Sequence, residues 1–145
     1  MTSENKKVVL VTGGARGIGK SIVLNMAQNN YDIIINYNQS YKSANELAKE
    51  VNNISDSKVK VIQADVSEEL EVQKMFLEIS KEFSGVDVLI NNAGITKDGL
   101  SMRMKTEDWD SVINTNLRGS YLCSQNAIKS MMSNRWGRII NISSV

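Results

Sequence analysis

The chain has 145 residues, a formal net charge of +1, one cysteine and no histidine. This length suits one domain with its own core, and the small charge gives no reason to expect a nucleic-acid partner. No apolar run is long enough to cross a membrane. A single cysteine excludes an internal disulfide, and the lack of histidine excludes His-based triads and most zinc sites, so we expect no metal. With no signal-peptide pattern before the first strand, these features predict a cytoplasmic protein.

Five short apolar runs predict buried strands. Each run is bounded by residues that favour turns, and continuous apolar character is typical of strands buried on both faces of a parallel sheet. The expected strands cover about residues 7–12, 33–35, 59–62, 86–90 and 138–143.

Amphipathic helices separate these strands. We expect Ser67 to be the N-cap of the third helix and Gly85 to end it, while Thr106 caps a long fourth helix that Gly137 breaks. The alternation of strand and helix predicts one dinucleotide-binding domain over 1–145, an α/β Rossmann fold with a doubly wound parallel sheet of order 3-2-1-4-5. The expected helices cover about residues 18–29, 41–53, 67–84 and 106–134.

A glycine-rich turn joins the first strand to the first helix. Gly13 can end the strand, Gly17 would let the backbone approach a phosphate, and Gly19 would let the helix pack closely on the sheet. Free N–H groups and the helix dipole then point at one place, which predicts a phosphate site. Two kinds of site compete here. Residues 14–21 match the G-x-x-x-x-G-K-[ST] pattern of a P-loop, whereas Thr12 and these glycines have the spacing of a dinucleotide site.

Motifs after the later strands favour the dinucleotide site. A P-loop protein needs an acid at the end of a second buried strand to hold magnesium, and the fourth strand ends in Asn91 and Asn92 instead. With the glycine turn, Asp65-Val66 and the runs at 91–94, 114–116 and 140–144, the chain resembles the short-chain dehydrogenase/reductase family over essentially its whole length. Segments 92–98, 102–105, 109–116 and 137–145 are most similar to family members that reduce 3-oxoacyl groups on acyl carrier protein.

The resemblance implies hydride transfer from a nicotinamide cofactor to a ketone. It implies that Asp65 and Val66 contact adenine, that Ser144 orients the substrate, and that Asn116 holds a water and the catalytic lysine in a proton relay. Ser144 and Asn116 are therefore the expected catalytic residues. The expected cofactor-binding residues are Thr12, Gly13, Arg16, Gly17, Ile18, Gly19, Asn36, Asp65, Val66, Asn92, Ala93 and Gly94.

The end of the second strand predicts NADP(H) rather than NAD(H). A site selective for NAD usually carries a carboxylate there, and residues 36–40 contain no acid. Asn36 could donate a hydrogen bond to a 2′-phosphate, and Arg16 would supply the positive charge that such a phosphate needs.

The chain carries only part of the family's catalytic set. The family's proton donor is a tyrosine followed four residues later by a lysine, and none of the four tyrosines here has a lysine at that spacing. We therefore expect the N-terminal portion of a reductase, truncated after strand five. We also expect an open edge on that strand and no useful turnover by the chain alone.

The leading hypothesis is NADPH-dependent reduction of a 3-oxoacyl thioester, linked to acyl carrier protein, in fatty acid synthesis. Reduction of acetoacetyl-CoA is the nearest rival. A non-catalytic nucleotide-binding module and a P-loop NTPase using Gly14 to Ser21 remain as alternatives. Arg135 and Arg138 could meet an acidic carrier protein, and the long helix could form a homo-oligomer in the full-length protein. Cys123 is expected to be a buried small hydrophobe.

Overall fold

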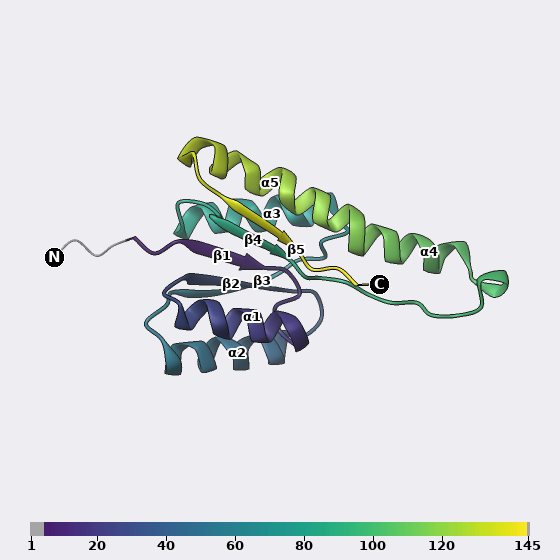
Figure 1. Ribbon diagram of the computed structural model, residues 1–145, viewed down its shortest axis with the longest axis horizontal. Helices are drawn as coiled ribbons and strands as arrows, with labels where there is room; N and C mark the ends of the chain where they lie inside the picture. The colour runs from purple at the N-terminus through teal and green to yellow at the C-terminus, as the bar shows by residue number, and fades with distance from the viewer. Residues whose placement is uncertain (1–4, 145) are drawn as a thin grey trace.

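A parallel five-stranded sheet lies between two layers of helices in the computed structural model, which describes residues 5–144 (Figure 1). The strand order is β3-β2-β1-β4-β5, which confirms the predicted doubly wound Rossmann arrangement. The strands are β1 (Val8–Val11), β2 (Asp32–Tyr37), β3 (Val59–Gln63), β4 (Val88–Asn91) and β5 (Arg138–Asn141).

The helices divide between the two faces of the sheet (Figure 1). One face is covered by α1 (Gly17–Gln28) and α2 (Tyr41–Ile54). The other face is covered by α3 (Glu69–Glu82) and by a long rod that follows the short 3₁₀ turn η1 (Ser101–Arg103). This rod, predicted as one helix, has three parts: α4 (Thr106–Ile113), the π-helical turn η2 (Asn114–Arg118) and α5 (Gly119–Asn134).

Alternating side chains of the central strands build two cores. In β1, Val9 and Val11 face α1 and α2, whereas Val8 and Leu10 face α3 and α5. Because both faces of the sheet are covered there, the strand is apolar at every position, as the sequence pattern predicted. Cys123 of α5 lies fully buried in the second core, which confirms its expected role.

Three helix boundaries differ from the prediction. Ser67 caps no helix: its N–H and hydroxyl both donate to Oδ1 of Asp65 (2.9 and 2.6 Å), and α3 starts two residues later. Thr106 is the first residue of α4 and not its cap. The end of α5 is set by Arg135 in a left-handed conformation (φ 52°), before Gly137 is reached. Gly137 is needed for space instead, because a Cβ there would lie 2.4 Å from Cγ of Met131.

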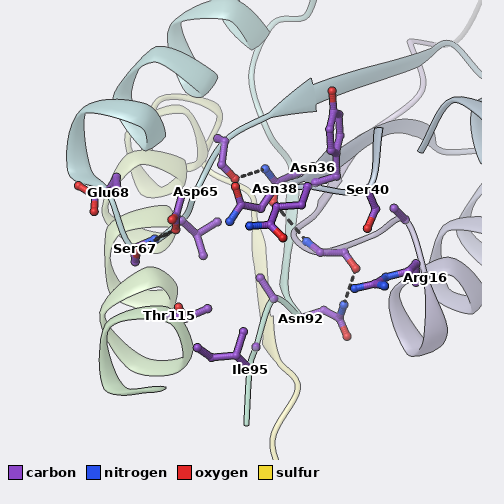
Figure 2. A pocket seen from close by; sticks show the side chains of 18 of the residues that line it. Arg16, Asn36, Asn38, Ser40, Asp65, Ser67, Glu68, Asn92, Ile95 and Thr115 are labelled. Atoms are coloured by element: carbon purple, nitrogen blue, oxygen red, sulfur yellow. Dashed lines mark hydrogen bonds between the residues drawn. The ribbon is translucent and has the colours of Figure 1, made fainter. Parts of the chain in front are cut away.

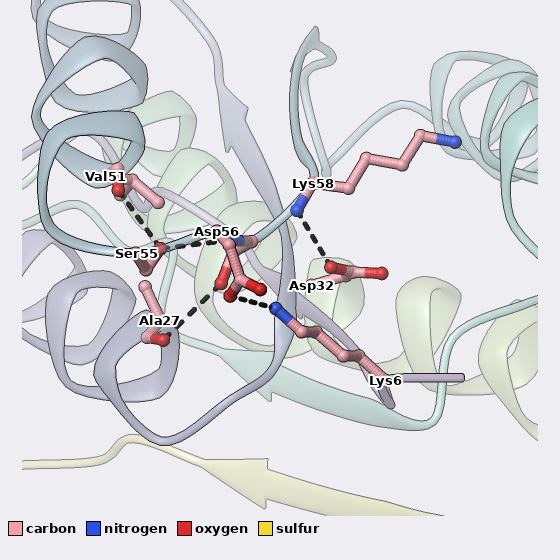
Figure 3. Close-up of polar contacts among 8 residues, drawn as sticks. Lys6, Ala27, Asp32, Val51, Ser55, Asp56 and Lys58 are labelled. Atoms are coloured by element: carbon pink, nitrogen blue, oxygen red, sulfur yellow. Dashed lines mark hydrogen bonds and ion pairs between the residues drawn. The ribbon is translucent and has the colours of Figure 1, made fainter. Parts of the chain in front are cut away.

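Polar contacts fix the amino edge of the sheet, where the strands begin, opposite its carboxyl edge (Figure 3). The N–H of Lys58 donates to Oδ1 of Asp32 (2.8 Å), which joins the start of β3 to β2. Lys6 pairs with Asp56, and this hydrogen bond lowers the pKa of the Asp56 carboxyl. The turn from α2 to β3 is thereby tied to the segment that enters β1.

Trp136 occupies the same edge, just before β5. Its ring lies 3.9 Å from the ammonium of Lys7 and 4.8 Å from the guanidinium of Arg138, measured to the ring centroid. The indole also packs against the core that α1 and α2 cover. Cation–π contacts therefore join the entry to β1 with the entry to β5.

The edge strand β5 is exposed along its whole length, as expected. Ile140 pairs in register with Ile90 of β4, but 47% of Ile140 is exposed against 3% of Ile90. Within residues 5–144, no helix has both the length and the apolar character that crossing a membrane requires.

Candidate cofactor site

A cavity of about 690 Å³ opens at the carboxyl edge of the sheet (Figure 2). Segments that follow β1, β2, β3 and β4 line it, together with Ser111 and the first residues of η2. The strand order reverses between β1 and β4, and ligands of open α/β sheets bind at such a switch point. Its volume falls within the range of about 300–1,000 Å³ that is usual for small-molecule and cofactor sites.

Thr12 ties the turn after β1 to the segment after β4. Its Oγ1 accepts hydrogen bonds from the N–H groups of Asn92 and Ala93, each at 3.0 Å. In return, Nδ2 of Asn92 donates to the carbonyls of Thr12 (3.1 Å) and Gly13 (3.0 Å). We call these four residues the β1–β4 knot. Thr12 is only 2% exposed and does not line the cavity, so its hydrogen bonds fix the walls, and its expected contact with a cofactor stays a prediction.

The glycines of the turn are needed for different reasons, either a positive φ or a lack of space for a side chain. Gly13 has a φ of +58°, and a Cβ there would lie 2.9 Å from Cα of Ala93. At Gly19 a Cβ would lie 2.5 Å from both the Gly13 carbonyl oxygen and Nδ2 of Asn92, so this glycine packs against the turn more than against the sheet. Gly17 has a φ of +54°, with nothing within 4 Å of an added Cβ, and it lines the cavity.

The start of α1 supplies the other features of an anion site. The helix begins at Gly17, and Arg16 precedes it in an extended conformation and lines the cavity. The unpaired N–H groups of a first helical turn and its positive dipole end attract a phosphate. Ile18, which the sequence placed among the binding residues, is 64% exposed beside this turn and is not part of the lining.

Lys20 does not occupy the position that a P-loop lysine needs. It lies within α1, and its ammonium is 3.1 Å from a carboxylate oxygen of Glu50 on α2. Neither Lys20 nor Ser21 lines the cavity. In a P-loop this lysine reaches the phosphates of the nucleotide.

Asn36 differs from its expected role as a phosphate donor. The residue lies in the cavity wall but is only 1% exposed. Its Nδ2 donates to the carbonyls of Ala64 (3.1 Å) and Ile62 (3.4 Å), and its Oδ1 accepts from the Gly13 N–H (3.2 Å). The side chain therefore joins the ends of β2 and β3 to the glycine turn, and its donors point away from any ligand. The polar residues that line this part of the cavity after it are Asn38, Gln39 and Ser40.

The segment after β3 forms a second wall. Asp65 and Val66, which the resemblance implies contact adenine, line the cavity. The turn holds its shape because Ser67 donates twice to Asp65 and the Asp65 N–H donates to Glu71 (2.6 Å). From the rod across the cavity, Nη1 of Arg118 donates to the Ser67 carbonyl (2.7 Å).

Asn116 in η2 forms two hydrogen bonds with the segment after β4. Its Oδ1 accepts from the N–H of Ile95 (2.8 Å), and its Nδ2 donates to the Ile95 carbonyl (3.0 Å). Ile95, Asn114 and Thr115 line the cavity and were missed by the sequence reasoning. Two signals pointed to this region: the segments 92–98 and 114–116 carried the family resemblance, and asparagine is unfavourable inside a helix without a specific contact.

Ser144 follows β5 at this same edge, outside the cavity lining. Asn91 holds the end of β5 in place, because its Nδ2 donates to Oδ1 of Asn141 (2.8 Å) and to Oγ of Ser124 (3.2 Å). Oδ1 of Asn91 is buried and has no hydrogen-bond partner among the described residues. Cys123 is no nucleophile in this region, since burial raises the pKa of its thiol to about 12.

Comparison with known proteins places the chain in a family. The sequence profile of short chain dehydrogenase matches residues 7–145. The 3-oxoacyl-[acyl-carrier-protein] reductase FabG of Staphylococcus aureus is 45% identical over 139 residues, which cover 96% of this chain and 56% of the relative. FabG of Staphylococcus epidermidis is also 45% identical, over 96% of this chain and 57% of the relative.

A cyanobacterial relative has a similar identity and coverage. The 3-oxoacyl-[acyl-carrier-protein] reductase of Synechocystis is 42% identical over 145 residues, which cover 100% of this chain and 58% of that protein. The chain thus spans a little over half the length of these relatives. With a family profile matched over nearly all its residues, on a Rossmann sheet whose cavity lies at the switch point, the chain belongs to the short-chain dehydrogenase family.

Proposed function

We propose that the chain is the cofactor-binding part of an NADPH-dependent reductase. The full-length protein would convert a 3-oxoacyl thioester, carried on acyl carrier protein, to the 3-hydroxyacyl form during fatty acid synthesis in the cytoplasm. The names of the similar bacterial proteins support this substrate. The observation that carries the proposal is the cavity itself, where Arg16 and the glycine turn face a strand end that has no acid.

The residues present fit a dinucleotide. Gly17 offers backbone without a side chain at the start of α1, where the diphosphate would bind. Asp65 and Val66 would hold the adenine, and the segment 92–94 would lie along the adenosine ribose and the diphosphate. When bound, NADPH would supply the hydride for the reduction.

Selectivity for the 2′-phosphate rests on charge. Arg16 lines the cavity near the residues that follow β2, and none of residues 36–40 is acidic. Since the amide of Asn36 is engaged elsewhere, we assign the contact with a 2′-phosphate to Arg16 and Ser40. A guanidinium is well suited to this task because it donates two parallel hydrogen bonds to phosphate oxygens.

Two residues of the chain would serve the chemical step. Ser144 would orient the substrate carbonyl through its hydroxyl group. Asn116 would take part in holding a water of the proton relay; in this structure Ile95 takes both polar groups of its side chain, and the hydroxyl of Ser120 donates to its main-chain carbonyl (3.0 Å). Residues 1–145 contain no tyrosine with a lysine four positions later, so we expect the chain alone to bind cofactor without useful turnover.

Partners are proposed on two surfaces. Arg135 and Arg138 remain our candidates for docking the carrier protein, although they lie at the amino edge of the sheet, away from the cavity. The acyl chain attached to the carrier protein would then reach the cavity by passing round the sheet, or would enter the cavity of a neighbouring subunit. Exposed apolar side chains along the α4–α5 rod support a homo-oligomer, namely Trp109, Leu117, Tyr121 and Met132.

The proposal is tested by cofactor binding and reduction with the full-length protein. We expect Arg16→Gln to weaken NADPH binding about tenfold or more while NADH binding changes less than about twofold, measured by fluorescence titration. Lys42→Gln, which removes an exposed cation on α2, is the matched control. Equal losses for the two cofactors would refute the selectivity. Reduction of acetoacetyl-CoA but not of acetoacetyl-carrier protein would favour the rival substrate.

A further inference from the structure

The π-helical turn η2 contacts both walls of the cofactor cavity. It interrupts the rod between α4 and α5, and its residues Asn114 and Thr115 face the cavity. A single π-turn within an α-helix costs regular hydrogen bonding and often marks a functional position. The contacts of the next residues indicate what this turn does.

One contact braces the segment after β4. Asn116 binds both the N–H and the carbonyl of Ile95, at 2.8 and 3.0 Å. Gly94 lies directly beside it, since an added Cβ would be 3.3 Å from Oδ1 of Asn116. The wall formed by residues 92–95 is therefore fixed at one end by the β1–β4 knot and at the other by η2.

The other contact braces the segment after β3. Nη1 of Arg118 donates to the Ser67 carbonyl at 2.7 Å, a charge-assisted bond between residues 51 positions apart. Ser67 in turn holds Oδ1 of Asp65. The start of α5 approaches closely here, because a Cβ on Gly119 would lie 2.7 Å from Cγ2 of Val66. Arg118 thus acts through Ser67 on the turn that holds Asp65, while its neighbour Gly119 packs against Val66, and Arg118 itself does not line the cavity.

We propose that Arg118 is a positioning residue for the adenine side of the nucleotide site. This inference rests on the proposed function, in which a dinucleotide lies with its adenine against Asp65 and Val66. The Arg118 side chain is exposed, so its bond contributes little to the stability of the whole domain. Its effect falls on the position of residues 65–67, which lie between regular elements, and therefore on affinity for the adenine half alone.

The test separates the two halves of the cofactor. With the full-length protein, calorimetry would measure binding of adenosine 2′,5′-bisphosphate, 5′-AMP and nicotinamide mononucleotide. We expect Arg118→Met to weaken both adenosine ligands by the same factor, about three- to tenfold, and to leave the nicotinamide ligand unchanged. Arg118→Lys, which keeps a cationic donor, should restore much of the affinity. Arg103→Met in η1, which lines a different surface, is the matched control.

Several results would overturn the positioning role. One is unchanged binding of both adenosine ligands, and another is an equal loss of affinity for nicotinamide mononucleotide. The third is a larger loss of affinity for the bisphosphate than for 5′-AMP, because this difference would mean that Arg118 acts by its charge alone. If Arg118→Met does not fold, Arg118→Gln replaces it with the same expected pattern. If the wild-type protein binds none of the three ligands, the proposed function itself fails.

Discussion

The ends of β1 and β5 lie at the same edge of one sheet, yet they are held very differently. After β1, Thr12 is 2% exposed, and the hydrogen bonds of the β1–β4 knot tie it to the segment after β4. After β5, Ser143 and Ser144 are exposed, and the strand leading to them is open to solvent on its outer side. The part of the site that would hold a cofactor is thus tied together by hydrogen bonds between strand ends, whereas the part that would hold a substrate follows an exposed edge strand.

This difference follows from how each end is stabilised. The turn after β1 lies between two neighbouring strands, so its polar groups find partners within the sheet. The end of β5 has a neighbour on one side only, through Asn91. Four measurements test this difference between the two strand ends.

The largest effect is expected from a matched pair of isoleucines. Ile90 and Ile140 face each other in register across β4 and β5, but only Ile90 is buried. In the 145-residue chain, Ile90→Ala should lower the free energy of unfolding by about 2–5 kcal/mol, because it leaves a cavity. Ile140→Ala should cost about 1 kcal/mol or less. Equal costs in urea unfolding would mean that β5 is covered in solution, and the contrast between the two ends would be lost.

A second pair separates packing from backbone conformation in the glycine turn. Gly13→Ala imposes a positive φ on alanine and pushes its Cβ into Ala93, so we expect a loss of about 2–4 kcal/mol in the free energy of unfolding. Gly17→Ala has the same backbone problem with open space around it, and should cost about 1–2 kcal/mol. Chemical denaturation measures both. If Gly17→Ala were the more damaging, the knot would not be the rigid part of the turn.

Within the knot, the Thr12 hydroxyl can be removed with little change of shape. Thr12→Val leaves the N–H groups of Asn92 and Ala93 without their acceptor, and should destabilise the protein by about 1–3 kcal/mol. Thr12→Ser keeps the oxygen and serves as the control, with a loss of less than about 1 kcal/mol. A larger loss for serine than for valine would show that packing of the methyl group, and not the hydrogen bonds, holds the two strand ends.

The smallest effect concerns Cys123 and tests how completely α5 shields from solvent the core that it covers together with α3. Burial raises the pKa of Cys123 from 9.0 to about 12, so the folded state keeps its proton where the unfolded state loses it. This contribution to stability is complete below pH 9 and is lost as the pH rises toward 12. Relative to Cys123→Ala, wild-type stability should fall by about 1 kcal/mol between pH 8 and 10. Rapid labelling of the native thiol at pH 8 would contradict the closed core.

Short-range patterns were enough to predict the sheet and the glycine turn. A continuous apolar run predicts a buried strand wherever it occurs, and the glycines act through their own φ and their immediate neighbours. The strand order followed from the doubly wound topology that the alternation of strands and helices predicts. The strands and the glycine turn themselves depend on residues that lie close together in the sequence.

Contacts between distant segments explain what the sequence did not indicate at Asn36 and Arg118. Asn36 was expected to donate to a ligand, but two carbonyls of the neighbouring β3 segment accept hydrogen bonds from its amide. At Ser67 the cause is local, because its N–H and its hydroxyl both donate to Asp65, two residues earlier. The bond from Arg118 joins segments 51 residues apart, and nothing in the sequence around either residue indicates it. Which polar group pairs with which is decided only when the chain is folded.

The indole of Trp136 gives the chain an optical reporter of its own. The sequence contains two tryptophans, and Trp109 is 58% exposed on the rod, so its emission resembles that of indole in water. Trp136 lies between the charged groups of Lys7 and Arg138, where the first and last strands enter the sheet. Detachment of β5 would remove one of these cations and hydrate the ring. Fluorescence of a Trp109→Phe variant would therefore follow the closing of the sheet in real time, without any attached dye.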